Sequence, residues 1–400
     1  MSIGLPQGTS GRFDWQRQWQ SVVYGRGSLA QLEAEIDALG ARRVMIVTTG
    51  SLENQGTVLK TVEDALGSRL VGRFSGCRQY APRSTVVACV ARARELSPDL
   101  LVSLGGGSVV DTAKATALMS CENLREAADL DRYRGSGAAA CRLTGRPIPL
   151  IALPTTLSAA EYSPMIAITN EASGEREPFQ NSALCPRVVL LDPELTRATP
   201  DYLWLTTGIK ILSDAFEQFS TGVAGPVMEP LTLRAFELLV RELPASRGVS
   251  SEARLACQLG SWLGLFGTFS AGTKVGIGAA IRHQLGMIHK LSHGEATCGI
   301  LARVVGASAP TAPGPLGALC HAVDVPFDPA DPTAASTALA ERMDALLAEL
   351  ELPRTLAALR IRREDLPELA RRAAGDFAAR SRSARIWSQA EIEGLLEASL

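Results

Sequence analysis

The chain has 400 residues, of which 46% are hydrophobic and 20% are charged, and its formal net charge at pH 7 is −2. This length favours two domains, and the composition is typical of a globular enzyme. The small net charge argues against nucleic acid as a partner, and no apolar run has the length of a membrane span. Residues 1–14 lack the apolar segment of a secretory signal, so we expect a cytoplasmic protein.

Eight cysteines are spread over the chain, and no two of them form a C-x-x-C pair. Most stand among apolar residues, as Cys89 does in the segment V-A-C-V. We therefore expect buried free thiols, as in a cytoplasmic protein, and no disulfide framework.

Strands and helices alternate in the first half of the chain. This alternation predicts βαβ units and a parallel sheet. The predicted strands are Val44–Thr48, Arg69–Phe74, Leu100–Leu104, Pro149–Leu153, Met165–Thr169 and Val188–Leu191, and the predicted helices are Leu52–Leu66, Ser84–Leu96 and Gly107–Met119. A charged, hairpin-like loop, Asn170–Glu177, separates the last two strands.

A glycine triplet ends the predicted strand at Leu104. The segment L-L-V-S-L-G-G-G-S reads as a buried strand, a tight turn and the start of a helix. Glycine lets an anion approach the backbone closely, and the first N–H groups of the helix point at that anion. Asp111 and Lys114 follow one turn apart. The pattern predicts a site for a phosphate or pyrophosphate.

Strand signals nearly vanish after Pro200, and long segments with helical periodicity follow. We predict helices at Tyr202–Thr221, Pro230–Arg241, Ser251–Gly264, Gly276–Gly286, Ala335–Glu351, Arg363–Ala374 and Gln389–Leu396. The sequence thus predicts an α/β domain over residues 1–199, with a Rossmann-like parallel sheet that binds a nucleotide, and an all-helical domain over residues 200–400 that binds the substrate.

Four motifs, listed at the end of this paragraph in chain order, together resemble those of the iron-containing (group III) alcohol dehydrogenase superfamily. H-Q-L-G and T-G-I-K are most similar to its maleylacetate-reductase-like branch. The resemblance implies the dehydroquinate-synthase-like fold of that superfamily, NAD or NADP as cofactor, and hydride transfer to or from a small alcohol or carbonyl compound. The motifs are Tyr24-Gly25-Arg26-Gly27, Gly105-Gly106-Gly107-Ser108 with Asp111 and Lys114, Pro154-Thr155-Thr156, and His283-Gln284-Leu285-Gly286 followed by Ser292-His293-Gly294.

The resemblance also implies which residues bind the cofactor. The glycine loop would hold the pyrophosphate, Asp111 would lie near the nicotinamide, and Arg176 falls where the family has a cofactor-binding lysine. Thr48–Leu52 contains no acidic residue that would repel a 2′-phosphate, so NADP remains possible beside NAD. Arg83, after Pro82, could face the cofactor cleft, but a solvated loop arginine is the commoner outcome and is what we expect. The cofactor-binding set is Thr49, Ser51, Gly105, Gly106, Gly107, Ser108, Asp111, Thr155, Thr156 and Arg176.

The metal site of the family is degenerate in this chain. The resemblance places its four ligand positions on Lys210, Asp214, Ala279 and His293. A catalytic divalent metal usually has three protein ligands, whereas Asp214 and His293 are two at most and Lys210 brings a positive charge. We therefore expect no metal in this protein.

Two interpretations of Lys210 stay open. Its ammonium could occupy the vacated cation position and stabilise charge on the substrate oxygen, or Lys210 and Asp214 could form a structural ion pair. In the family, the residue matching His283 lies near the substrate and relays a proton, a role that suits a group titrating near neutral pH. The predicted catalytic residues are Lys210, Asp214, His283 and His293.

The leading functional hypothesis is a metal-independent NAD(P)-dependent oxidoreductase that acts on a small molecule as a homodimer. The alternative comes from the dehydroquinate-synthase-like relatives, in which a bound nicotinamide serves a lyase or cyclisation reaction without net redox change. Cofactor absorbance during turnover separates the two hypotheses.

Overall fold

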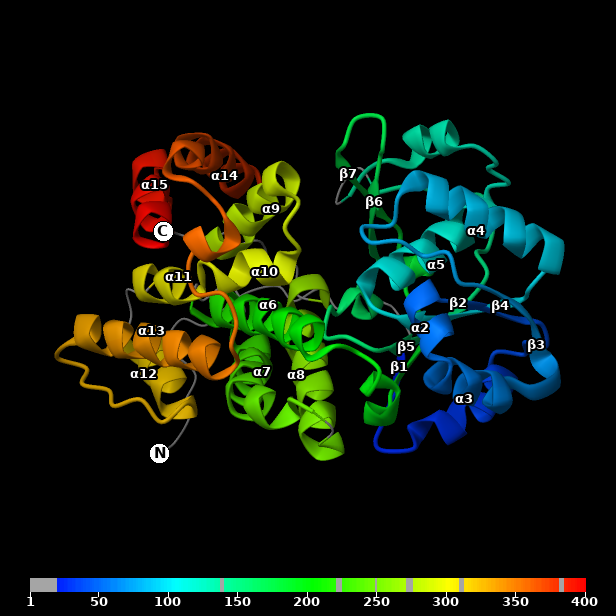
Figure 1. Cartoon of the computed structure of the whole chain (residues 1–400), viewed down its shortest axis with the longest axis horizontal. Coiled ribbons are helices and arrows are strands. Elements are labelled where there is room, and N and C mark those ends of the chain that lie inside the picture. Colours follow the sequence, from blue (N-terminus) through cyan, green and yellow to red (C-terminus); the bar gives the residue numbers. More distant parts are fainter. Residues whose placement is uncertain are drawn as a thin grey trace. The chain divides into compact units, whose positions relative to one another are not determined.

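Six parallel strands form the central sheet of the N-terminal half, as the computed structural model of the chain shows (Figure 1). Their spatial order is β1-β8-β5-β4-β2-β3. Every predicted strand of this sheet is present, and one additional edge strand, β1, is not predicted. The strands are β1 (Ser21–Tyr24), β2 (Val44–Val47), β3 (Leu70–Phe74), β4 (Leu100–Gly105), β5 (Leu150–Pro154) and β8 (Val188–Leu191).

The structure describes residues 20–136, 140–220, 225–248, 250–270, 276–308, 313–380 and 385–400. These residues form two compact units. One contains residues 20–204 and 248–258 and is here called the α/β unit, and the other contains residues 205–247 and 259–400 and is called the helical unit. The predicted fold class is confirmed, while the division at residues 199 and 200 stays a prediction.

Five helices accompany the sheet in the α/β unit. The predicted helix Leu52–Leu66 is divided in two, because Gly56 between the halves has a left-handed backbone with φ at 75°. The helices are α1 (Leu32–Ala38), α2 (Gly50–Gln55), α3 (Thr57–Leu66), α4 (Arg83–Leu96) and α5 (Gly107–Cys121).

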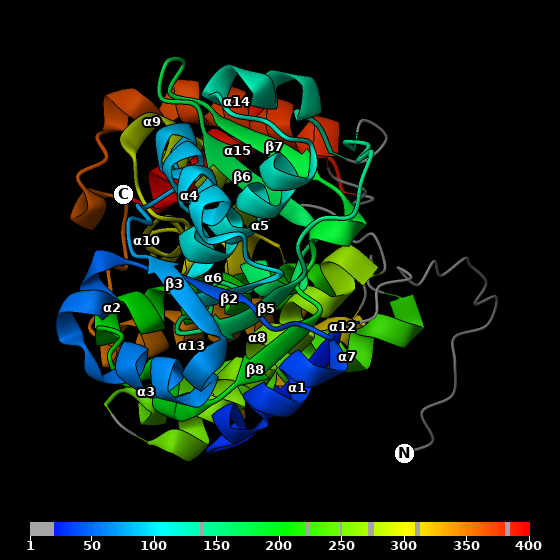
Figure 2. The same ribbon diagram turned by 90° about the vertical axis from the view of Figure 1, so that its right-hand side faces the viewer.

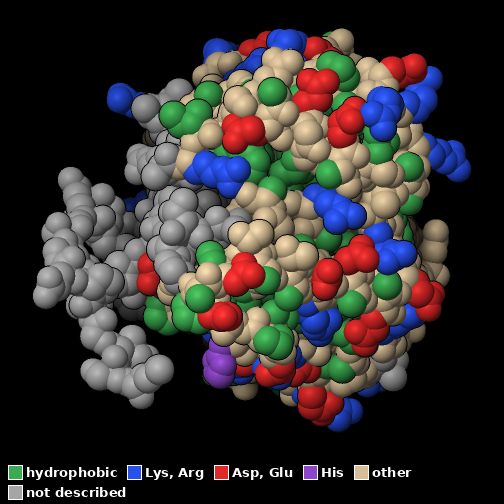
Figure 3. Space-filling model, turned by 90° about the vertical axis from the view of Figure 1, so that its left-hand side faces the viewer, with side chains coloured by type: hydrophobic (Ala, Val, Ile, Leu, Met, Phe, Trp, Pro, Cys, Tyr) green, Lys and Arg blue, Asp and Glu red, His purple; other side chains and the backbone are tan. Residues whose placement is uncertain are grey.

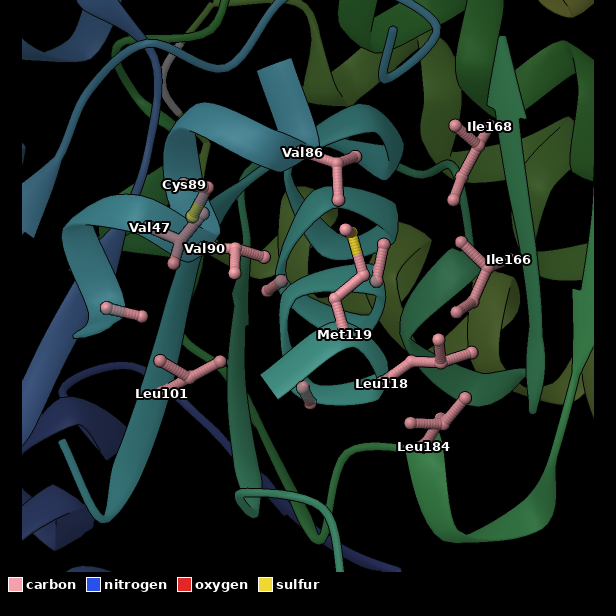
Figure 4. Packing of buried hydrophobic residues seen from close by; sticks show 14 of the residues in the cluster. Val47, Val86, Cys89, Val90, Leu101, Leu118, Met119, Ile166, Ile168 and Leu184 are labelled. Atoms are coloured by element: carbon pink, nitrogen blue, oxygen red, sulfur yellow. The ribbon is translucent and has the colours of Figure 1, made fainter. Parts of the chain in front are cut away.

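Alternating side chains of β2, β4 and β5 supply two apolar layers, one on either face of the sheet. Val44 and Ile46 of β2 pack in the layer that contains α1 and α3. Met45 and Val47 pack in the layer that contains α4 and α5, where Figure 4 shows Val47 beside Cys89 and Val90 of α4. Helices on both faces explain why these strands read as continuous apolar runs.

A two-stranded antiparallel hairpin contributes to the second layer. It consists of β6 (Met165–Thr169) and β7 (Arg176–Gln180), which lie side by side in Figure 2. β7 has the sequence R-E-P-F-Q and is not predicted, because its charges and proline hide the alternation. Phe179 is fully buried, so the strand does have an inward face.

Arg83 is buried, and the expectation of a solvated loop arginine is wrong. It is the first residue of α4, and its side chain is 6% exposed. Its Nε and Nη2 donate to one oxygen of Glu177 on β7, at 2.9 and 2.6 Å. The Glu177 side chain is 2% exposed, so this buried ion pair joins the hairpin to α4.

The helical unit contains most of the remaining helices. α9, α11, α14 and α15 share one apolar cluster, in which Ile281, Val304 and Phe377 are buried. The helices that follow residue 200 are α6 (Asp201–Ser220), α7 (Gly225–Ser246), α8 (Ser251–Ser270), α9 (Ile277–His289), α10 (His293–Cys298), α11 (Leu301–Ala307), α12 (Pro313–Ala322), α13 (Pro332–Glu349), α14 (Leu366–Arg380) and α15 (Gln389–Ala398).

Acidic and basic side chains are interspersed on the face drawn in Figure 3, with no large area of one sign. This agrees with the small net charge of the chain. Within the described ranges, no helix has both the length and the apolar character of a membrane span.

We predict that Arg83→Met destabilises the protein because it leaves the carboxylate of Glu177 buried without its main partner. The loss in free energy of unfolding should be about 3 kcal/mol, near the lower end for breaking a buried ion pair, since Asn170 still donates to Glu177. The matched control is Arg78→Met, whose ion pair with Glu171 is exposed and should contribute less than about 1 kcal/mol. Urea unfolding of both variants measures the difference, and equal losses would contradict the prediction.

Candidate active site

The glycine loop between β4 and α5 has the backbone of an anion cradle. Gly105 has φ at 153°, a conformation that side chains rarely adopt, and a Cβ there would lie 2.6 Å from a methyl group of Val109. A Cβ on Gly106 would lie 3.0 Å from the side chain of Thr156. No side chain among the described residues caps the N-terminus of α5. The cradle thus fits a dinucleotide pyrophosphate at a helix N-terminus.

Ser108 connects the glycine loop to a second group of predicted cofactor residues. Its hydroxyl accepts a hydrogen bond from the N–H of Tyr80 at 2.9 Å. The guanidinium of Arg176 lies 5.1 Å from the centre of the Tyr80 ring, and its Nη2 lies 3.9 Å from Asp111. Burial raises the pKa of Asp111, while the nearby charges of Lys114 and Arg176 oppose that rise. Tyr80 is a member of this group that the sequence does not reveal.

Threonines stand at the carboxyl ends of β5 and β2, the two strands on either side of β4. Thr155 follows β5 and donates its N–H to the carbonyl of Gly105 at 3.1 Å. Thr48 at the end of β2 donates its hydroxyl to the carbonyl of Leu104 at 2.9 Å. Thr49 caps α2, and Ser51 is exposed in its first turn. The structure therefore brings the predicted residues to one edge of the sheet, where ligands bind in open α/β folds.

Lys114 belongs to the glycine motif, but its contacts indicate a structural role. Its side chain is fully buried in α5. Its ammonium donates to the carbonyls of Ala160, Ser163 and Met165 at 2.6, 2.6 and 3.1 Å. Burial lowers the pKa of Lys114. This side chain supports the segment between β5 and β6.

Asp214 lies between two cations in the helical unit. Lys210, one turn before it on α6, places Nζ 2.9 Å from Oδ2, and Arg282 on α9 places Nη2 2.6 Å from Oδ1. Burial alone would raise the pKa of Asp214, but the charges of Arg282 and Lys210 outweigh burial and lower it. Arg282 is not among the predicted site residues. It is a second cation on this carboxylate, beside Lys210.

Glu217 stands one turn after Asp214 and holds the N-terminus of α9. Its carboxyl oxygens accept the N–H groups of Gly278 and Ala279 at 2.6 and 3.2 Å. Burial raises its pKa to about 7, against the opposing charge of Arg282. Ala279, at a family ligand position, has no metal-binding side chain.

His283 has a carboxylate partner that the sequence does not reveal. Its Nδ1 lies 2.8 Å from Oδ2 of Asp376 on α14. The ring of His293 lies edge-on to that of His283, with centroids 5.5 Å apart. His283 and His293, both among the predicted catalytic residues, are therefore neighbours. The signal for Asp376 is weak, since it lies 93 residues further along the chain.

The residues present do not fit the divalent metal of the family. Over the ranges that the structure describes, no three His, Cys, Asp or Glu side chains come together in a way that could hold a metal ion. Two cations already bond to Asp214, the carboxylate that a metal would need. We therefore derive no catalytic step through a metal.

Two family descriptions together match most of the chain. Residues 20–193 match "iron-containing alcohol dehydrogenase", and residues 204–400 match "Fe-containing alcohol dehydrogenase family, C-terminal". The chain is also similar to maleylacetate reductase of Sphingobium indicum, with 26% identity over 73% of this chain and 74% of the relative. Lactaldehyde reductase of Escherichia coli is 27% identical over 89% of this chain and 92% of the relative.

Solved structures share the fold of the whole chain. The structure of 1,3-propanediol oxidoreductase superposes with a TM-score of 0.85 at 23% identity, and the match covers 98% of this chain and 100% of the other. Maleylacetate reductase from Agrobacterium tumefaciens gives 0.78 at 22% identity, covering 98% and 99%. At these identities the likeness supports the fold alone.

We predict that Gly106→Val blocks dinucleotide binding, because the branched side chain would fill the space of the pyrophosphate. Loss of even one or two hydrogen bonds to a charged group should weaken binding by about 100-fold. Gly394→Val is the control, since a Cβ on Gly394 of α15 meets nothing within 4 Å. Titration with NADH and NADPH, followed by fluorescence, measures the affinities. Unchanged affinity in the folded Gly106 variant would refute the cofactor assignment.

Proposed function

Because the chain belongs to the iron-containing alcohol dehydrogenase family and is a dehydrogenase- or reductase-like enzyme of the NAD(P)-dependent type, we propose that it transfers hydride between NAD(P) and a small alcohol or carbonyl compound without a metal. The observation that carries the proposal is that Asp214, at one ligand position of the family, contacts two cations: Lys210, at another ligand position, and Arg282.

A hydride transfer to a carbonyl carbon needs a positive group near the carbonyl oxygen, which gains negative charge. In the family the metal supplies that charge. An ammonium ion held in a buried site supplies part of it, because a fixed charge needs little reorganisation during the reaction. The Lys210 side chain is 16% exposed and is held by Asp214. We assign it to the substrate oxygen.

The proton of the substrate hydroxyl requires a base, and His283 fits that task. The carboxylate of Asp376 orients the imidazole through Nδ1 and stabilises its protonated form. His293 packs against the same ring and limits its movement. We assign His283 as the group that takes up or returns the proton, Asp376 as its positioning residue, and His293 as a neighbour that confines it.

The cofactor would bind in the α/β unit. Gly105–Ser108 would hold the pyrophosphate, and Asp111, Thr155, Thr156 and Arg176 would surround the nicotinamide half, with Thr49 and Ser51 beside the adenosine ribose. Bound NAD(P) supplies or accepts the hydride. Thr48–Leu52 has no acidic side chain, and Glu53, the next residue, forms an ion pair with Arg73 at 2.8 Å. Both NAD and NADP therefore stay in the proposal.

Location and assembly complete the proposal. None of the eight cysteines, all of which the structure describes, forms a disulfide, and seven of them are buried, which supports a reducing compartment such as the cytoplasm. A homodimer rests on the family resemblance. We propose two domains: residues 1–199 bind the cofactor, and residues 200–400 bind the substrate.

The test of the proposed function follows NAD(P)H absorbance and substrate concentration together during turnover. Equal changes in both support an oxidoreductase. Loss of substrate at constant absorbance would instead assign a lyase or cyclase reaction and overturn the proposal.

We predict that the purified protein carries no stoichiometric iron or zinc and keeps its activity after treatment with a chelator. The reason is that Lys210 and Ala279 stand where two metal ligands belong. Elemental analysis of protein incubated with Fe²⁺ or Zn²⁺ and then dialysed provides the measurement. About one metal ion per chain, lost together with activity, would contradict this prediction.

We predict that Lys210→Met lowers turnover by about 100-fold or more, the effect of removing one preorganised electrostatic donor. Cofactor affinity should hardly change, because the predicted cofactor residues belong to the other unit. Stability should fall only slightly, since Arg282 continues to neutralise Asp214. Single-turnover rates and melting temperatures of the same variant decide between the two interpretations of Lys210. A normal rate with a lower melting temperature would show that Lys210 serves only in a structural ion pair with Asp214.

A further inference from the structure

Arg282 has hydrogen-bond donors that the protein does not use. A guanidinium has five N–H groups. Nη2 bonds to Asp214, but Nε and Nη1 are buried and have no hydrogen-bond partner among the described residues. The residue is 6% exposed, so water does not replace the missing partners freely. Buried donors on a charged group are costly when left unsatisfied, which points to a ligand.

The charge around Arg282 favours an anion as that ligand. Asp214 is one carboxylate between two cations. The oxygens of Glu217, the other nearby carboxyl group, already accept N–H groups of Gly278 and Ala279. The site therefore offers the directed donors of a charged guanidinium to a further oxyanion, and Arg is the side chain best suited to bind a carboxylate.

We propose that Arg282 binds the carboxylate of the substrate, and that the substrate is a small 2-oxo or 3-oxo acid or the corresponding hydroxy acid. This rests on the proposed function. Lys210 and Arg282 contact the two oxygens of one carboxyl group, so they flank a group of that size. A carbonyl oxygen and a carboxylate that are separated by one or two carbons would let one small molecule contact both cations beside Asp214.

The reaction is balanced by the cofactor of the proposed function. In the reductive direction the carbonyl carbon gains a hydride from NAD(P)H, which becomes NAD(P)⁺. The electron pair of the C=O π bond moves to the oxygen beside Lys210, and that oxygen takes a proton from His283. Arg282 keeps its charge and its hydrogen bonds to the carboxylate throughout, so it acts on binding and orientation.

Calorimetric titration of the cofactor-free enzyme at pH 7 tests the site independently of hydride transfer. The probes are oxamate, which is a small carboxylate, oxamide, which is its uncharged counterpart, and inorganic phosphate. We expect oxamate to bind, and oxamide and phosphate to bind more weakly. Arg282→Met should weaken oxamate binding by about 10- to 100-fold, and Arg282→Lys should restore part of it. Asp214 keeps Lys210 in both variants, so both should fold.

Arg371→Met is the matched control, because Arg371 on α14 is an exposed arginine of the same unit. Its oxamate affinity should equal that of the unmodified enzyme. Equal binding of oxamate by the Arg282→Met protein would overturn the proposal, as would equal binding of oxamate and oxamide. If phosphate bound more tightly than oxamate and its binding depended on Arg282 in the same way, the substrate would be a phosphorylated compound, and the assignment of a carboxylate would be refuted.

Turnover assays with 2-oxo and 3-oxo acids separate this inference from the proposed function. If oxamate binding depended on Arg282 but none of these acids changed the NAD(P)H absorbance during turnover, the anion site would be supported and the oxidoreductase function would be refuted. Reduction of 2-oxo and 3-oxo acids with a KM and a rate that Arg282→Met does not alter would support the oxidoreductase and refute the anion site.

Discussion

The carboxylate of Asp214 constrains the arrangement of the helical unit around its polar centre. Lys210 on the same helix and Arg282 on α9 both depend on it, because two buried cations without an anion would repel each other in a medium that screens charge poorly. Glu217 fixes the start of α9 one turn away. The two carboxyl groups of α6 thereby set the register of α9, and this register directs His283 towards Asp376 on α14.

Charged side chains differ from a metal ion in ways that matter for the proposed chemistry. A metal accepts lone pairs from several directions and exchanges with solvent, whereas an ammonium and a guanidinium are covalently attached and donate along fixed directions. A site of this kind selects substrates by the placement of their oxygens. Both cations also lower the pKa of Asp214, which favours the ionised carboxylate that holds them.

The sequence predicted the periodic parts of this protein and missed the contacts that depend on distant residues. The strands of the sheet, except β1, and the glycine loop have local signals, namely apolar runs and a triplet of residues without side chains. β7 was missed because a strand with R-E-P-F-Q lacks visible alternation. Arg282 and Asp376 were missed for another reason. Arg282 contacts Asp214 because α9 packs near α6, and Asp376 contacts His283 because α14 packs near α9. No spacing along the chain predicts these contacts between helices.

The surroundings of Lys114 have a practical consequence for chemical labelling. Three converging carbonyls match the three N–H bonds of an ammonium, and a planar guanidinium would not replace it, although arginine far outnumbers lysine in this chain. Acylating reagents attack unprotonated amines that they can reach, such as the exposed amine of Lys60. The amine of Lys114 is sealed by the fold. Modification of Lys114 would therefore report local opening of the segment beside the glycine loop under conditions in which the rest of the chain stays folded.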